Sequence, residues 1–302
     1  MRRLLALLIA AGSFVACLAD DAGNLYDSRP IISPYYFGPN AFPVPEIAER
    51  TSPFLNVGIF GEYYRGTRKD NTYDLLLKTE IPLFTPRVNL SLWWQVMEWY
   101  HTSKEFLQTA DIAEPYREDA LTGHRSGDIY VATLIQILDE NKYRPGLTVR
   151  AALKTASGGG FNVRRFYDSP GYFFDTALCK RFILSSVIPI RFNCAVSTGF
   201  LCWQTAQSVQ NDAIMYGIKL GVGYGPFTLN GEFGGYSGWQ HADRHSGAKA
   251  FDQPSRIQLD LSYKIREFIL DVKFLKGIHD YPYTGLKIGL LYNFKILRHN
   301  NL

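Results

Sequence analysis

The 302-residue sequence is poor in cysteine and methionine, with four of the first and three of the second. Four cysteines are too few for a disulfide scaffold, and no CxxC or HExxH spacing supplies the usual ligands of a zinc site. The net charge is small as well, because 32 basic and 28 acidic residues leave only +4. So balanced a charge does not mark a nucleic-acid-binding protein. We therefore expect no metal, no cofactor and no nucleic-acid partner.

Long apolar runs are also missing. Beyond residue 19, no stretch approaches the ~20 apolar residues that a membrane-spanning helix needs, and the mean hydropathy is −0.11. A polytopic helical membrane protein is therefore excluded. Aromatic residues, in contrast, are abundant at 15%, with 20 Phe, 19 Tyr and 5 Trp. A disordered chain has few aromatics and a high net charge, so disorder is excluded too.

Residues 1–19 have the layout of a secretory signal peptide, because two arginines precede a short apolar stretch that ends in small residues. We expect cleavage after Ala19 and export of the mature chain. Cys17 follows a small residue, so a lipidated N-terminus is an alternative that the sequence leaves open. Residues 20–52 contain five prolines and no regular period. They predict an extended N-terminal segment.

From residue 53 onward, apolar residues recur at every second position. Between Ile188 and Phe200, for example, most even-numbered residues are apolar and the odd-numbered ones are mainly polar or small. Successive side chains of a strand point to opposite faces, so each segment has one apolar and one mixed face. Twelve such segments are predicted, at 53–65, 71–84, 87–101, 127–138, 146–157, 171–183, 188–203, 212–224, 227–238, 255–265, 268–276 and 284–295.

The connections between these segments alternate in length. Thr85-Pro86 and Gly225-Pro226 are short, whereas 102–126 and 239–254 are long. Short turns alternating with long loops, over an even number of strands, are typical of bacterial outer-membrane barrels. We predict an all-β fold, a twelve-stranded antiparallel transmembrane β-barrel over 53–295, followed by a C-terminal tail at 296–302. Residues 20–52 would then lie in the periplasm or plug the lumen. A soluble β-sandwich is the alternative, although its strands average only about five or six residues.

Aromatic residues fall near the ends of the predicted strands at two levels, which we interpret as two interfacial girdles. The outer level holds Tyr63, Tyr64, Tyr73, Trp99, Tyr100, Tyr172, Trp203, Tyr236, Trp239 and Tyr283, and the inner level holds Phe54, Phe84, Phe182, Phe227, Phe268 and Phe294.

Several stretches resemble an uncharacterised family of porin-like, gram-negative outer-membrane β-barrels. These are SPYYFGPNAFPVPE from Ser33, IPLFTPRVNLSLW from Ile81, VMEWY from Val96, LKTASGGG from Leu153 and RFYDSPGYFFD from Arg165. The resemblance implies a barrel of about this size with a proline-rich N-terminal segment, and it implies no activity. Apolar residues alternate along 290–294, and the run ends at the aromatic Phe294. This pattern resembles the C-terminal signal read by the barrel assembly machinery, although in this sequence further residues follow the aromatic one.

The mixed face of the predicted strands carries acidic and basic residues in nearly equal number. A Lys or Arg facing lipid near the midplane costs ~2–4 kcal/mol, so we place these residues in the lumen. They predict either a narrow pore that leans slightly toward anions or a salt-bridged interior that conducts nothing. The candidate pore-lining residues are Arg150, Lys154, Asp175, Arg181, Arg191, Lys219, Glu232, Asp271, Lys273 and Lys287.

We predict an outer-membrane protein that acts as a porin-like channel for small solutes and is not an enzyme. One alternative is a lipid or ester hydrolase that uses the loop at 239–247. There His245 and Ser246 are adjacent, so a strand would point them to opposite faces and the His could not activate the Ser hydroxyl. Another alternative is a closed barrel that serves adhesion or envelope structure. The expected partners are outer-membrane lipids, lipopolysaccharide and the barrel assembly machinery, and the solute is not identified.

Overall fold

The computed structural model describes residues 38–66, 69–108, 112–166, 170–183, 190–204, 210–239 and 253–294. All of these residues belong to one compact unit. The predicted signal peptide with Cys17, the hydrolase candidates His245 and Ser246, and the C-terminal tail lie outside the described residues.

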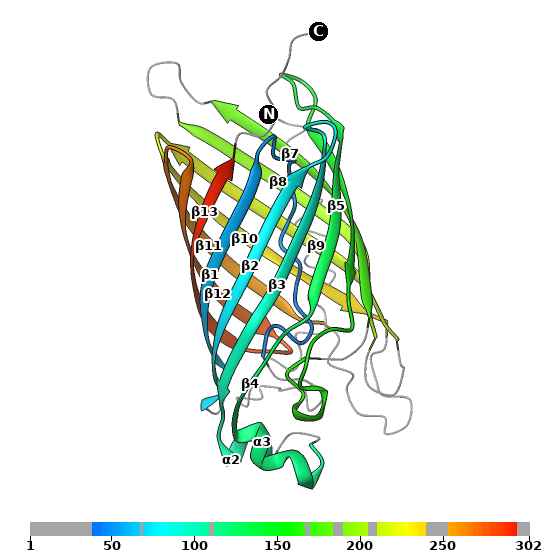
Figure 1. The fold of residues 1–302 in the computed structure, drawn as a ribbon. Helices are drawn as coiled ribbons and strands as arrows, with labels where there is room; N and C mark the ends of the chain where they lie inside the picture. The colour runs from blue at the N-terminus through cyan, green and yellow to red at the C-terminus, as the bar shows by residue number, and fades with distance from the viewer. Residues whose placement is uncertain are drawn as a thin grey trace. The chain divides into compact units, whose positions relative to one another are not determined.

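Twelve long antiparallel strands form a closed barrel (Figure 1). They are β1 Leu55–Gly66, β2 Asn71–Pro82, β3 Val88–His101, β5 Ile129–Leu138, β6 Gly146–Lys154, β7 Gly171–Ile183, β8 Arg191–Gln204, β9 Gln210–Tyr224, β10 Phe227–Gly238, β11 Ser255–Ile265, β12 Phe268–His279 and β13 Tyr283–Phe294. Each pairs with its neighbours in the sequence, and β1 pairs with β13 from Leu55↔Phe294 to Gly66↔Tyr283. The predicted twelve-stranded antiparallel barrel is confirmed.

The two ends of the barrel differ. At one end, two-residue turns at 225–226 and 266–267 connect neighbouring strands, with positive φ at Gly225 (55°) and Arg266 (55°). Glycine reaches this region without strain, whereas Arg266 occupies it with a side chain. We refer to this as the short-turn end and to the opposite end as the long-loop end.

At the long-loop end, the connection after β3 is folded where the sequence predicted a loop. It contains the helices α2 Lys104–Leu107 and α3 Arg117–Leu121, the 3₁₀ turn η3 Glu114–Tyr116 and the strand β4 Thr122–Arg125, which pairs with the end of β3. A small apolar core of Phe106, Leu107, Ile112 and Ala120 packs against Tyr100 and stabilises this cap. No helix in the described ranges is long and apolar enough to cross a membrane.

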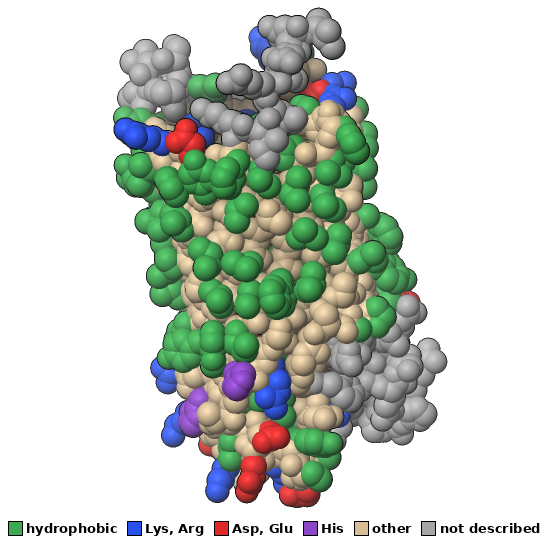
Figure 2. All heavy atoms as spheres, viewed as in Figure 1, with side chains coloured by type: hydrophobic (Ala, Val, Ile, Leu, Met, Phe, Trp, Pro, Cys, Tyr) green, Lys and Arg blue, Asp and Glu red, His purple; other side chains and the backbone are tan. Residues whose placement is uncertain are grey.

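The outer wall of the barrel is apolar (Figure 2). Side chains such as Ile59, Leu259 and Ile288 leave about half of their surface exposed (49%, 50% and 49%). Hydrocarbon suits such a surface, and charged residues gather beyond it toward the ends, as in a transmembrane barrel.

The aromatic residues of the outer level divide between the two faces of the wall. Tyr73, Trp99 and Trp239 are exposed on the outside, as expected for a girdle. Tyr64, Trp203, Tyr236 and Tyr283 instead point inward and belong to a buried cluster, and Tyr100 packs inward against the long-loop cap. For these five the interfacial interpretation was wrong, because residues that share a level on a strand still alternate between its two faces. At the short-turn end, Phe182, Phe227, Phe268 and Phe294 are exposed on the outside as predicted.

Candidate functional site

Residues 38–52, the described part of the proline-rich segment, run through the barrel (the blue trace inside it in Figure 1). At the long-loop end, the Gly38 amide donates a hydrogen bond to the Tyr281 hydroxyl (2.5 Å). At the short-turn end, Asn89 Nδ2 donates to the Ser52 carbonyl (3.1 Å). The segment therefore spans the length of the lumen.

The composition of this segment suits a chain without strand partners. Proline has no backbone N–H, so Pro39, Pro43 and Pro45 place no donor in the lumen that would need an acceptor. Ala41 and Phe42 pack into the inward-facing aromatic cluster that includes Tyr64, Trp203 and Tyr236. Apolar burial thus holds the part of the segment that lies nearer the long-loop end.

Side-chain hydrogen bonds also attach the part of the segment near the long-loop end to the barrel wall. Asn40 Nδ2 donates to Asp74 Oδ2 (2.7 Å) and to Glu98 Oε2 (3.2 Å). Asp74 is on β2 and Glu98 on the neighbouring β3, and both carboxylates are buried. One amide therefore bridges two acidic residues of the wall.

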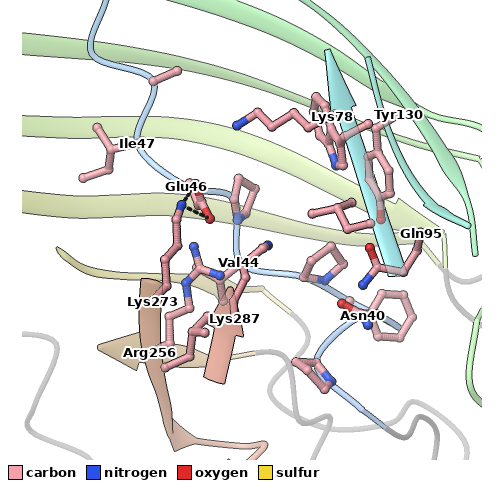
Figure 3. Close-up of a pocket in the computed structure, with 18 of the residues that line it drawn as sticks. Asn40, Val44, Glu46, Ile47, Lys78, Gln95, Tyr130, Arg256, Lys273 and Lys287 are labelled. Carbon is pink, nitrogen blue, oxygen red and sulfur yellow. Dashed lines mark hydrogen bonds and ion pairs between the residues drawn. The ribbon is translucent and has the colours of Figure 1, made fainter. Parts of the chain in front are cut away.

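Glu46 is the central anchor of the segment. Its Oε2 lies 3.0 Å from Lys273 Nζ on β12, and its carbonyl accepts a hydrogen bond from Arg150 on β6 (2.9 Å). Lys78 and Lys287 line the same cavity as Glu46, so its carboxylate lies in basic surroundings. Figure 3 shows its carboxylate beside Lys273.

Contacts with several strands continue toward the short-turn end. The Ile47 amide donates to Glu232 on β10 (3.3 Å), and Thr148 Oγ1 on β6 donates to the Ala48 carbonyl (2.8 Å). Glu49 lies 3.3 Å from Lys219 on β9. The segment is thus attached to walls on several sides.

The structure places eight of the ten predicted lumen residues in this interior network. Arg150 and Asp175 form a two-point ion pair across β6 and β7 (2.8 and 2.9 Å). The others pair as follows: Lys154 with Asp128, Lys219 with Glu49, Lys273 with Glu46, Asp260 and Asp271, Lys287 with Glu62, and Glu232 with Arg256. Arg181 and Arg191 lie near the short-turn end, where both are exposed, and Arg191 donates to the Gly225 carbonyl (2.9 Å).

Sequence reasoning missed five charged residues of the network, namely Glu46, Glu49, Glu98, Asp128 and Arg256. Arg256 shares the lumen-facing parity of Asp260 on β11, so strict alternation could have found it. Glu98 could not be found this way. Leu75 pairs with Met97 and Leu76 with Gln95, so Val96 is an extra residue in β3 that shifts the alternation by one. Glu46 lies in a segment without any period.

A cavity of about 450 Å³ remains beside the segment. Basic residues outnumber acidic ones in its lining: Arg50, Lys78, Arg150, Lys219, Arg256, Lys273 and Lys287 against Glu46, Glu49, Glu62, Glu80 and Asp128. In the described part of the chain, no group of three or more His, Cys, Asp or Glu is arranged to hold a metal ion. The site can therefore bind and orient polar solutes by charge.

No protein-family model and no curated protein matches the chain. Solved structures do match it. The COG4313 outer membrane channel from Pseudomonas putida F1 aligns with a TM-score of 0.55 and 11% identity, over 83% of this chain and 99% of that one. The transport unit of the autotransporter AIDA-I from Escherichia coli aligns with a TM-score of 0.50 and 9% identity, over 84% and 94%. The KdgM porin aligns with a TM-score of 0.46 and 11% identity, over 79% and 99%.

At such low identity, these comparisons show the fold alone. The protein has the fold of outer-membrane β-barrels, and the resemblance drawn from the sequence motifs is confirmed at the level of the fold. Within that class, it is a twelve-stranded barrel whose lumen contains part of its own N-terminal segment.

Proposed function

We propose that the protein is a porin-like channel of the gram-negative outer membrane that passes small solutes between the barrel wall and residues 38–52. The observation that carries this proposal is the charged cavity of about 450 Å³ inside an apolar-walled barrel. A volume of this size lies within the ~300–1,000 Å³ that small-molecule sites occupy. The leader-like residues 1–19 and the apolar wall support export to the outer membrane, where lipid, lipopolysaccharide and the assembly machinery would be the partners.

Barrel size supports a narrow path. Eight-stranded barrels are filled by their side chains, whereas barrels of 16–18 strands leave a wide aqueous channel. Twelve strands lie between these limits, and residues 38–52 occupy part of the remaining space. The charges that face this space are mostly paired with one another, so a solute would pass along a rigid, polar surface.

Planar-bilayer conductance tests the proposal. The purified wild-type chain is expected to show small, discrete openings, and a variant that lacks residues 20–52 is expected to show larger ones. Circular dichroism and thermal unfolding would verify that both proteins are folded. A folded wild-type protein without discrete openings would overturn the proposal. The proposal also includes no catalysis, so the same preparation should release no product from phospholipid or ester substrates.

A further inference from the structure

Lys78 differs from the other lysines that line the cavity. Lys219, Lys273 and Lys287 each have a carboxylate within 4.0 Å, supplied by Glu49, Glu46 and Glu62 respectively. Lys78 on β2 is half-buried, and it has no ion pair or hydrogen bond with any residue in the ranges that the structure describes. Figure 3 shows its side chain extending from the strand into the cavity on the side of Glu46.

The acidic residues near Lys78 are held elsewhere. Glu80 lies two residues further along β2, and its two oxygens accept hydrogen bonds from Asn89 Nδ2 (2.9 Å) and Asn56 Nδ2 (3.2 Å). Glu46 is held by Lys273 at 3.0 Å. Among the described residues, no carboxylate oxygen lies within ion-pair distance of the half-buried Lys78 ammonium, so a mobile anion would lower the cost of burying this charge.

The surroundings of Lys78 add to this preference for an anion. Lys273, Lys287 and Arg256 line the same cavity and each lies beside a carboxylate, but basic residues outnumber acidic ones in the whole lining. An excess of positive charge in a space with low-dielectric walls raises the local concentration of anions. Ser91 on the neighbouring β3 also lines the cavity. It pairs with Glu80, two residues along β2 from Lys78. Its hydroxyl supplies a second donor of the kind that an oxyanion requires.

We propose that the cavity binds one small oxyanion, a carboxylate or a phosphate, through the Lys78 ammonium, with the Ser91 hydroxyl as a second donor. The inference rests on the proposed function in that it names the class of solute for the same lumen. Binding at equilibrium does not require conductance, however, so the two can be tested apart.

Equilibrium dialysis of the detergent-purified full chain tests the site, with labelled inorganic phosphate and labelled acetate in separate arms at constant ionic strength and neutral pH. We expect one anion per chain in at least one arm, which also identifies the source. Lys78→Met should weaken binding at least tenfold, Ser91→Ala about threefold, and Lys78→Arg should restore most of the affinity. Lys264→Met is the matched control, because it removes the same charge from an exposed lysine of β11 that does not line the cavity.

Three results would overturn the inference: no binding of either anion, wild-type affinity in folded Lys78→Met, or an equal loss in Lys264→Met, which would indicate a long-range effect of charge. Circular dichroism would establish that the variants are folded, and Ser91→Ala tests the site without a change of charge. If the protein binds the anion but shows no conductance, the proposed site stands and the proposed channel is refuted. If it conducts but binds neither anion, the channel stands and the site is refuted.

Discussion

Lys273 Nζ on β12 lies 3.0 Å from Glu46 Oε2, so the barrel wall holds a carboxylate of the N-terminal segment in the lumen. On β6, Arg150 holds the carbonyl of the same residue. The strand order places β7 to β11 between β6 and β12 in one direction, and β13, β1, β2, β3 and β5 between them in the other. Glu46 is therefore attached to opposite walls, and it links the segment to the barrel as a whole.

The first prediction concerns the strength of this attachment. Glu46→Gln removes the negative charge that lies 3.0 Å from Lys273 Nζ, so the buried ammonium loses a charged partner. Hydrogen exchange of peptides covering 38–52 should therefore show less protection at pH 7 in Glu46→Gln than in the wild type. Equal protection in the two proteins would contradict this.

The second prediction concerns the Arg150–Asp175 ion pair. Removal of Arg150 leaves the nearly inaccessible Asp175 carboxylate unpaired, and breaking a buried pair in this way costs about 3–5 kcal/mol. Arg150→Met should therefore lower the free energy of unfolding strongly, whereas the double variant Arg150→Met with Asp175→Leu should recover much of the loss. Urea unfolding in lipid measures both. Equal destabilisation of the single and double variants would show that the charge is not the cause.

The third prediction concerns the closure between β1 and β13. Gly289 on β13 pairs with Phe60 on β1, and a Cβ on Gly289 would lie 2.0 Å from the Phe60 ring. Overpacking of this kind costs about 1–3 kcal/mol. We expect Gly289→Ala to lower the unfolding midpoint clearly. Gly61→Ala is the control, because a Cβ on Gly61 meets no atom within 4 Å. Similar midpoints for the two variants would contradict the packing of this seam.

The fourth prediction locates the membrane on the barrel wall. Ile288 lies near the middle of β13 and Ile183 at the end of β7, and both are exposed on the outside. An arginine at the bilayer midplane costs about 2–4 kcal/mol, against about 0–1 kcal/mol near an interface. Ile288→Arg should therefore destabilise the protein in lipid far more than Ile183→Arg does. An equal effect of the two substitutions would argue against a lipid boundary at this position.

Much of the barrel was predictable because strand geometry is local. The alternation seen between residues 188 and 200 places Ala195 inside and Val196 outside, and β8 follows this pattern, with Ala195 buried and Val196 exposed. The prediction fails at β3, where the extra residue Val96 brings Glu98 to the lumen. Nothing in the local sequence marks that bulge, since it depends on how β3 registers against β2. The inward-facing Tyr64 and Trp203 show the same limit. The position of a residue along its strand sets its depth in the membrane, but this depth does not specify whether the side chain points to lipid or into the lumen.

The amino-acid sequence by itself determined the class of fold, the number of long strands and the lumen-facing position of most charged residues. These properties follow from a two-residue period and from the cost of placing charge in lipid. Only the tertiary structure decided that the charges pair with one another and with residues 38–52. Glu46 and Lys273 are 227 residues apart, and no local pattern specifies which charges meet across a barrel. The structure also distinguished Lys78, since only the described surroundings of a lysine show that none of their carboxylates forms an ion pair with it.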